Sequence, residues 1–167
     1  MAQEVVQQQN PQSNEPEYCY CPPIIDSEWD EREIDWTGKQ FFRATYRAWL
    51  YSPREDLSVK IINAYKEIAK RGYGFIPNGL HLYRGGMFRG EILIEIKNGH
   101  MDDPEVKTFM GYVYSKIYIG PLADLPKVSK TFNFKALNIY TIHFSCPVCT
   151  PDPNLQKTVL IGEKRFY

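Results

Sequence analysis

Alternation between apolar and polar positions predicts most of the secondary structure of this chain. The clearest case is Glu91-Ile-Leu-Ile-Glu-Ile96, where isoleucines occupy every second position and so share one face of a strand. A two-residue period of this kind is typical of β-strands that cover a buried layer. Further strands with the same period, or with many aromatic and β-branched residues, are predicted at 41–51, 79–83, 108–119, 138–144 and 158–162.

Two stretches place their apolar residues at helical spacing instead. The first runs near 56–71, and Gly72 follows its basic end as a helix-terminating residue should. The second runs near 122–134, where Pro126 limits how far the helix can begin upstream. Each helix presents a single apolar stripe, so both helices are expected to cover one face of a shared sheet.

The predicted elements occur in the same order twice. Repeats at about 39–99 and 105–165 each give strand, helix, strand, strand. The predicted fold class is therefore α+β, with tandem duplicated modules forming one antiparallel sheet that carries both helices on one face. The uncovered face of that sheet would carry a set of aromatic and acidic side chains, namely Trp49, Tyr51, Glu91, Glu95, Tyr112, Tyr114 and Tyr118.

The start of the chain differs in composition from the rest. Residues 1–16 contain no aromatic residue and little apolar surface to offset the entropy of ordering, so we expect a disordered tail over 1–20. An extended lead-in at 21–38 contains Trp29 and Trp36, which could lie against the domain. Residues 39–167 are expected to form a single domain.

The charge balance narrows the classes of partner. Twenty basic and twenty acidic residues give a net charge of zero, whereas nucleic-acid binders normally carry a basic excess. The chain contains no apolar run long enough to cross a bilayer and no hydrophobic signal core at its N-terminus. We therefore expect a cytoplasmic monomer that binds a small molecule, and neither nucleic acid nor a membrane.

Four cysteines form two pairs, and three states remain open for them. Cys19 lies in the expected tail and Cys21 in the lead-in, while Cys146 and Cys149 lie in the loop before the last strand. Plain thiols, a disulfide and a structural zinc site are all compatible with this spacing, and zinc would require at least three sulfurs to converge. No cofactor is otherwise expected.

The aromatic residues suggest a ligand groove. Twelve Tyr, nine Phe and three Trp make up 14% of the chain. Aromatic walls attract flat rings, and the carboxylates of Glu91 and Glu95 would neutralise a cation. If aromatic side chains enclosed Glu91, burial would raise its pKa and suit it to general-base catalysis.

The duplicated order and the strand at Glu91 resemble the gyrase-inhibitor (GyrI)-like family of small-molecule-binding domains over about 39–163. In that family an acid opens the last strand of a repeat and is followed by alternating Ile or Val, which Glu91, Ile92 and Ile94 match. Glu95 stands where Pro is common, and Thr158 replaces the acid in the second repeat. Because the ligand-contacting acid of multidrug-binding members lies in that later repeat, its role passes to Glu91 only by pseudo-symmetry.

Three functions follow from these features. The favoured one is noncatalytic binding of an aromatic or cationic small molecule in a groove between the repeats. The first alternative is cofactor-independent hydrolysis of a reactive electrophile, with Glu91 as the general base and a nearby Tyr as hydrogen-bond donor. The second alternative is a structural or adaptor role for the aromatic face.

Overall fold

The computed structural model describes residues 24–132, 136–143, 145 and 149–164. Within them the chain forms ten strands and a few helical segments. In chain order these are α1 (Asp26–Trp29), β1 (Arg32–Asp35), β2 (Gln40–Trp49), β3 (Ser52–Pro53), α2 (Leu57–Lys70), β4 (Gly74–Phe75), β5 (His81–Arg84), β6 (Arg89–Lys97), β7 (Val106–Thr108), β8 (Tyr112–Ile119), η1 (Leu122–Asp124), α3 (Leu125–Phe132), β9 (Ala136–His143), η2 (Pro153–Leu155) and β10 (Lys157–Lys164).

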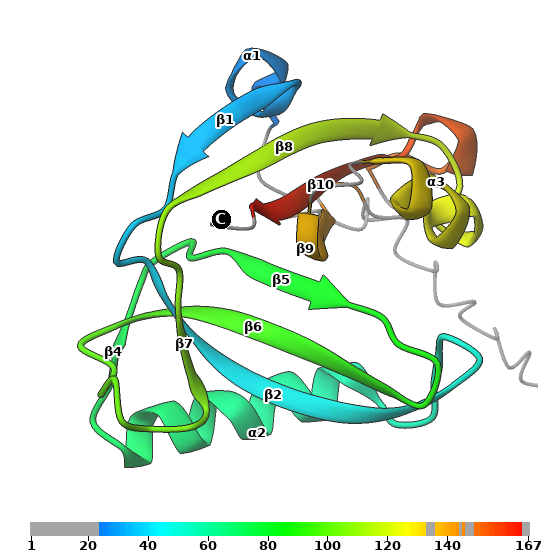
Figure 1. Ribbon diagram of the computed structural model, residues 1–167. Helices are drawn as coiled ribbons and strands as arrows, with labels where there is room; N and C mark the ends of the chain where they lie inside the picture. The colour runs from blue at the N-terminus through cyan, green and yellow to red at the C-terminus, as the bar shows by residue number, and fades with distance from the viewer. Residues whose placement is uncertain (1–23, 133–135, 144, 146–148, 165–167) are drawn as a thin grey trace, which may run out of the picture.

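All ten strands belong to one antiparallel sheet. Its order is β1-β8-β10-β9-β5-β6-β2-β3, with β4 also paired to β6 and β7 also paired to β2. The sheet curls, so that β2, β5 and β6 face β8, β9 and β10 across an interior (Figure 1). The β5–β9 junction, where Tyr83 pairs with Thr141, joins these two halves.

The main core lies inside the curl and is built by the strands together with the residues that directly follow β1 and β7. An aromatic cluster occupies part of it, with ring centroids of Trp36 and Phe109 5.1 Å apart and those of Phe41 and Phe109 5.4 Å apart. The fully buried Leu93 of β6 packs in the same layer. Contact between two halves of one sheet therefore excludes water from this core.

A second core lies on the outer face of β2 and β6, beneath α2 (Figure 1). Asp56 caps this helix by accepting a hydrogen bond from the backbone N–H of Ser58 at 2.8 Å. Gly72 adopts φ +73° just after the helix, a conformation that favours glycine. Ala64 and Ile68 of α2 are buried against the isoleucine face of β6. The even-numbered isoleucines of that strand thus face a helix.

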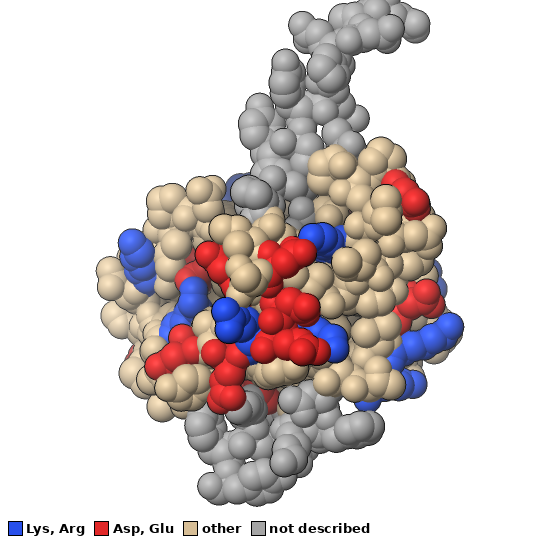
Figure 2. Space-filling model, turned by 90° about the horizontal axis from the view of Figure 1, so that it is seen from above, with Lys and Arg blue, Asp and Glu red and all other residues tan. Residues whose placement is uncertain are grey.

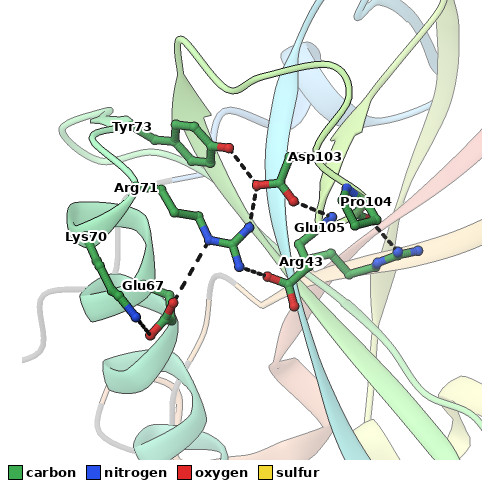
Figure 3. A network of polar contacts seen from close by, with 8 residues as sticks. All are labelled: Arg43, Glu67, Lys70, Arg71, Tyr73, Asp103, Pro104 and Glu105. Atoms are coloured by element: carbon green, nitrogen blue, oxygen red, sulfur yellow. Dashed lines mark hydrogen bonds and ion pairs between the residues drawn. The ribbon is translucent and has the colours of Figure 1, made fainter.

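The C-terminal end of α2 is tied to the loop before β7 by a polar network (Figure 3). The guanidinium of Arg71 pairs with the carboxylates of Asp103 and Glu105, and more loosely with Glu67 at 4.0 Å. The hydroxyl of Tyr73 donates to Asp103 at 2.6 Å. One arginine therefore links the helix to a loop about thirty residues away along the chain.

Ion pairs also hold the α1–β1 segment on the sheet. Lys157 of β10 lies 2.8 Å from Asp26, and Lys116 of β8 lies 3.1 Å from Glu31. Figure 2 looks down on this side of the molecule and shows acidic and basic side chains gathered together near the centre of the face. The two signs are mixed on this face.

The predicted α+β class is wrong. The dominant structure is a ten-stranded antiparallel sheet, and the main core forms between the two halves of that sheet. Among the described residues, none of the buried members of this inner core lies in a helix. The two predicted helical stretches appear as α2 and as the short α3, which is preceded by the single turn η1.

The missed strands explain part of this error. β1, β3, β4 and β7 are two to four residues long, so they are too short to display a two-residue period. Each is formed by backbone hydrogen bonds to a longer strand, which is either distant in the sequence or joined to it by a turn. The expected disordered tail at 1–20 lies outside the described residues. None of the helices in the described part of the chain is long and apolar enough to cross a membrane.

Candidate functional site

Two carboxylates lie inside the curled sheet. Glu91 and Glu95 occupy alternate positions on β6, on the same face as Leu93, and are only 7% and 8% exposed. Both point away from the isoleucine face, as the alternation along the strand predicted. That opposite side is an interior, however, because β8, β9 and β10 curl over it. Buried carboxylates require charged or hydrogen-bonding partners, and Glu91 and Glu95 each have different ones.

The partner of Glu91 is Arg84. These residues stand opposite each other on β5 and β6, and Arg84 Nε lies 2.9 Å from Glu91 Oε1. The arginine side chain is 41% exposed whereas the glutamate side chain is 9% exposed. The pair therefore lies where the interior meets solvent, with the carboxylate on the inner side.

The polar chain continues from Arg84 across the interior. Its guanidinium donates through Nη1 to Oδ1 of Asn138, and Asn138 Nδ2 donates to Glu163 at 2.9 Å. Lys107 Nζ lies 3.0 Å from both carboxylate oxygens of Glu163. We call Arg84, Glu91, Lys107, Asn138 and Glu163 the Glu91 network. It joins five strands and balances two carboxylates with two cations.

Tyr140 of β9 lies at the centre of this network. Its side chain is 1% exposed, and its ring centroid is 5.9 Å from the Arg84 guanidinium and 5.8 Å from Lys107 Nζ. Burial raises the pKa of the Tyr140 hydroxyl, and the negative charges of Glu91 and Glu163 raise it further. The hydroxyl therefore remains protonated at neutral pH and can donate a hydrogen bond.

Glu95 belongs to a separate contact set. It pairs with Lys39 and accepts a hydrogen bond from the backbone N–H of Leu80 at 2.8 Å. Lys39 Nζ also lies 5.6 Å from the ring centroid of the buried Trp36. Glu95 thus fastens the start of β2 to the start of β5.

The predicted aromatic groove does not form around Glu91. Trp49 and Tyr51 are exposed at the turn after β2. Tyr112, Tyr114 and Tyr118 alternate with the buried Val113, so they occupy the outer face of β8. The inner tyrosine is Tyr140 instead.

The outer tyrosines have other partners. The Tyr114 ring lies 5.7 Å from that of Phe132 in α3, and the Tyr118 hydroxyl donates to the carbonyl of Pro121 at 3.3 Å. Both contacts hold the η1–α3 segment against β8. These two tyrosines therefore pack an outer helix.

The proposed cysteine site falls mostly outside the described residues, because Cys19, Cys21 and Cys146 are not among them. Cys149 is exposed, and the hydroxyl of Thr150 lies 3.7 Å from its sulfur. Across the described ranges, no three His, Cys, Asp or Glu side chains come together in a way that would hold a metal ion.

Sequence reasoning missed most of the Glu91 network. The alternation in 138–144 places Asn138, Tyr140 and Ile142 on one face, which was a signal that a polar residue and a tyrosine face inward. Nothing in the local pattern of β10 or β7 marks Glu163 or Lys107. Their roles depend on strands that meet only in the folded sheet.

Comparison with known proteins identifies a family that this chain matches. The family model described as bacterial hydrolase matches residues 10–163. Two crystal structures of hydrolases from Listeria innocua resemble the fold, at 11% and 12% identity, each with a TM-score of 0.51 and covering 81% of this chain and 92% of the other. No curated protein matches this chain in sequence. These comparisons do not confirm the resemblance to the gyrase-inhibitor-like family.

Proposed function

This chain belongs to the bacterial hydrolase family, and we propose that it hydrolyses a reactive small electrophile, such as an activated ester, at the Glu91 network. The family supports the hydrolytic alternative over the noncatalytic binding that the sequence favoured. The observation that carries the proposal is a buried carboxylate, Glu91, held beside a guanidinium and a protonated tyrosine. No cofactor is required for this chemistry.

Glu91 would act as the general base. Its carboxylate accepts a proton from water while the water oxygen attacks the carbonyl carbon of the ester. The resulting oxyanion then collapses, the carbon–oxygen bond to the leaving group breaks, and the proton held by Glu91 passes to the leaving alkoxide. Acid and alcohol are the products, so atoms and charge balance.

Arg84 and Tyr140 would stabilise the oxyanion. Both can donate hydrogen bonds, and in a water-poor site such donors stabilise developing negative charge more than they do in bulk water. The raised pKa of Tyr140 keeps its proton available for donation. The substrate would approach past Arg84, whose side chain is the most exposed of the network.

Hydrolysis of p-nitrophenyl acetate tests the proposal. Glu91→Gln keeps the shape and removes the base, so turnover is expected to fall by about 10²–10⁴-fold. Tyr140→Phe is expected to lower kcat by about a hundredfold if it removes an oxyanion donor. Glu55→Gln is the matched control, because Glu55 is a half-buried, ion-paired carboxylate outside the network.

Two results would contradict the assignment. If the folded Glu91→Gln variant has the same turnover rate as the wild type, Glu91 is excluded as the base. The second result has two parts: the protein hydrolyses neither esters nor epoxides, and it binds ethidium saturably with an affinity that Glu91→Gln weakens. This result would show noncatalytic binding of a cationic aromatic ligand. Thermal melts of each variant establish that the fold is retained.

A further inference from the structure

Two turns at one end of the sheet expose five large apolar side chains. The turn between β2 and β3 and the turn between β5 and β6 lie together, at the right of Figure 1. The backbone N–H of Ala48 donates to the carbonyl of Phe88 at 2.9 Å, which fixes the two turns to each other. We call the exposed set the tip patch; it consists of Trp49, Leu50, Tyr51, Met87 and Phe88.

The tip patch is apolar, whereas turns that face solvent are usually built of polar residues and glycine. Leu50 and Tyr51 are 62% and 49% exposed, and the ring of Trp49 lies 5.5 Å from that of Phe88. Single exposed apolar residues are ordinary, but a contiguous group of this kind marks an interaction surface. Nothing in the proposed catalytic chemistry uses these residues.

The backbone of the first turn strengthens this argument. Leu50 and Tyr51 both adopt positive φ, at +48° and +68°, in the two-residue loop between paired Trp49 and Ser52. Positive φ at both positions is required by a type I′ turn, for which Asn-Gly is the preferred sequence. The chain therefore keeps two bulky apolar residues where they are strained and exposed, as interaction sites often do.

Basic residues surround the tip patch. Arg47, Arg54 and Arg89 are all exposed beside the two turns. Arg47 pairs with Glu55, but Arg54 and Arg89 have no carboxylate partner among the described residues. An apolar surface with arginines at its rim is complementary to a surface that is apolar inside and negatively charged outside.

We propose that the tip patch docks on an anionic lipid bilayer, with the arginines against the headgroups. Trp and Tyr favour the membrane–water interface, where their rings are buried and their polar atoms stay wet, while Leu, Met and Phe insert into the acyl boundary. Arginines near an anionic membrane are attracted by its surface potential. Such peripheral docking requires no membrane-spanning segment, and it therefore revises the sequence-based expectation of no membrane partner.

A second copy of the chain fits this surface less well. In a two-fold symmetric pair the same patch meets itself, so the rim arginines of both copies would be brought together. A bilayer containing anionic lipids offers the opposite charge instead. Self-association through the patch therefore becomes an outcome that the experiment must distinguish.

Co-sedimentation with vesicles tests this docking on the full chain. We expect binding to vesicles of phosphatidylcholine mixed with phosphatidylglycerol, and much weaker binding to phosphatidylcholine alone. Leu50→Asn/Tyr51→Gly introduces the sequence preferred in this turn, so stability should not fall. The same variant removes two side chains that would insert into the bilayer, so vesicle binding should weaken about tenfold. Met101→Asn, which removes an exposed apolar residue after the other end of β6, is the matched control.

The basic rim gives a second test. Arg54→Gln/Arg89→Gln should weaken binding to the anionic vesicles by about fivefold per arginine and leave the weak binding to neutral vesicles unchanged. Absence of binding to anionic vesicles, or equal binding by the turn variant, would overturn the proposal. A concentration-dependent dimer in sedimentation equilibrium that the turn variant abolishes would also overturn it, by assigning the patch to self-association.

Discussion

Arg84 and Glu91 face each other across the β5–β6 pair, and an ion contact of 2.9 Å joins the exposed guanidinium to the buried carboxylate. The register of the sheet creates this contact, because Arg84 is paired with Glu91 as Tyr83 is paired with Ile92. The arginine thereby stabilises a charge that the sheet has removed from water. A charge in this position without a partner would be costly.

Removing the guanidinium should destabilise the fold. Arg84→Met leaves the Glu91 carboxylate buried without its cation, and we expect the free energy of unfolding to fall by about 1–3 kcal/mol, less than for a fully buried pair because Arg84 is partly exposed. Urea denaturation measures this. Arg89→Met, at an exposed position with no ion pair to any residue that the structure describes, should change stability by less than about 0.5 kcal/mol. Equal stability of the two variants would show that the Arg84–Glu91 contact contributes nothing.

A close approach between two strands makes Gly90 sensitive to substitution. A Cβ atom at this position would lie 2.1 Å from Tyr46 Cζ, on the neighbouring strand β2. Gly90→Ala is therefore expected to displace the tyrosine ring from the core beneath α2 and to cost about 1–3 kcal/mol.

Gly85→Ala serves as its comparison, because a Cβ atom there would have no atom within 4 Å beyond its own chain neighbours. Thermal melts should show a lower Tm for the variant at position 90 and little change for the variant at position 85. If Gly90→Ala has the wild-type Tm, the Tyr46 ring can move to another position without loss of stability.

Acid should weaken the link between α2 and the loop before β7 (Figure 3). A hydrogen bond from Tyr73, followed by those from Arg71 and the Glu105 backbone, lowers the pKa of Asp103 to about 2 from an ordinary 3.8. The folded-state pKa is the lower one, so this stabilisation is complete above about pH 4 and is lost as the pH falls toward about 2. Asp103→Asn should therefore flatten the pH dependence of Tm within that window.

A carboxylate outside the polar network around Arg71 provides the comparison. Asp124→Asn, on an exposed carboxylate of η1, is the matched control variant. Identical acid limbs for wild type and Asp103→Asn would contradict the role assigned to the contacts of Asp103 with Arg71 and Tyr73.

Two histidines predict a second pH dependence nearer neutrality. Burial lowers the pKa of His81, whose Nε2 lies 2.6 Å from the Tyr65 hydroxyl, and likewise lowers that of His143. Because the folded protein disfavours the protonated imidazole, stability is complete above the ordinary pKa of 6.5 and decreases as the pH falls through that value.

NMR titration of the ring protons measures this directly. Both rings should titrate below 6.5, and His81→Gln/His143→Gln should reduce the loss of Tm between about pH 7 and pH 5. A midpoint for His81 above that of an unfolded peptide would contradict the prediction.

The sequence by itself determined the local features. The two-residue period of Glu91-Ile-Leu-Ile-Glu-Ile96 assigned its isoleucines to one face and its carboxylates to the other, and the helical spacing after Asp56 located α2. Both results depend on contacts between residues close in the chain. The order of side chains along a strand fixes which face each occupies.

Only the tertiary structure decided what covers each face. Backbone hydrogen bonds between distant strands curl the sheet, and this turns the side that carries Glu91 into an interior containing Tyr140, Asn138 and Glu163. The same pairing leaves Trp49 at an exposed tip and places Tyr114 against Phe132 on the outside. A strand's own residues specify its two faces, but the strand that packs across from it is set by pairing over long separations, which no local pattern encodes.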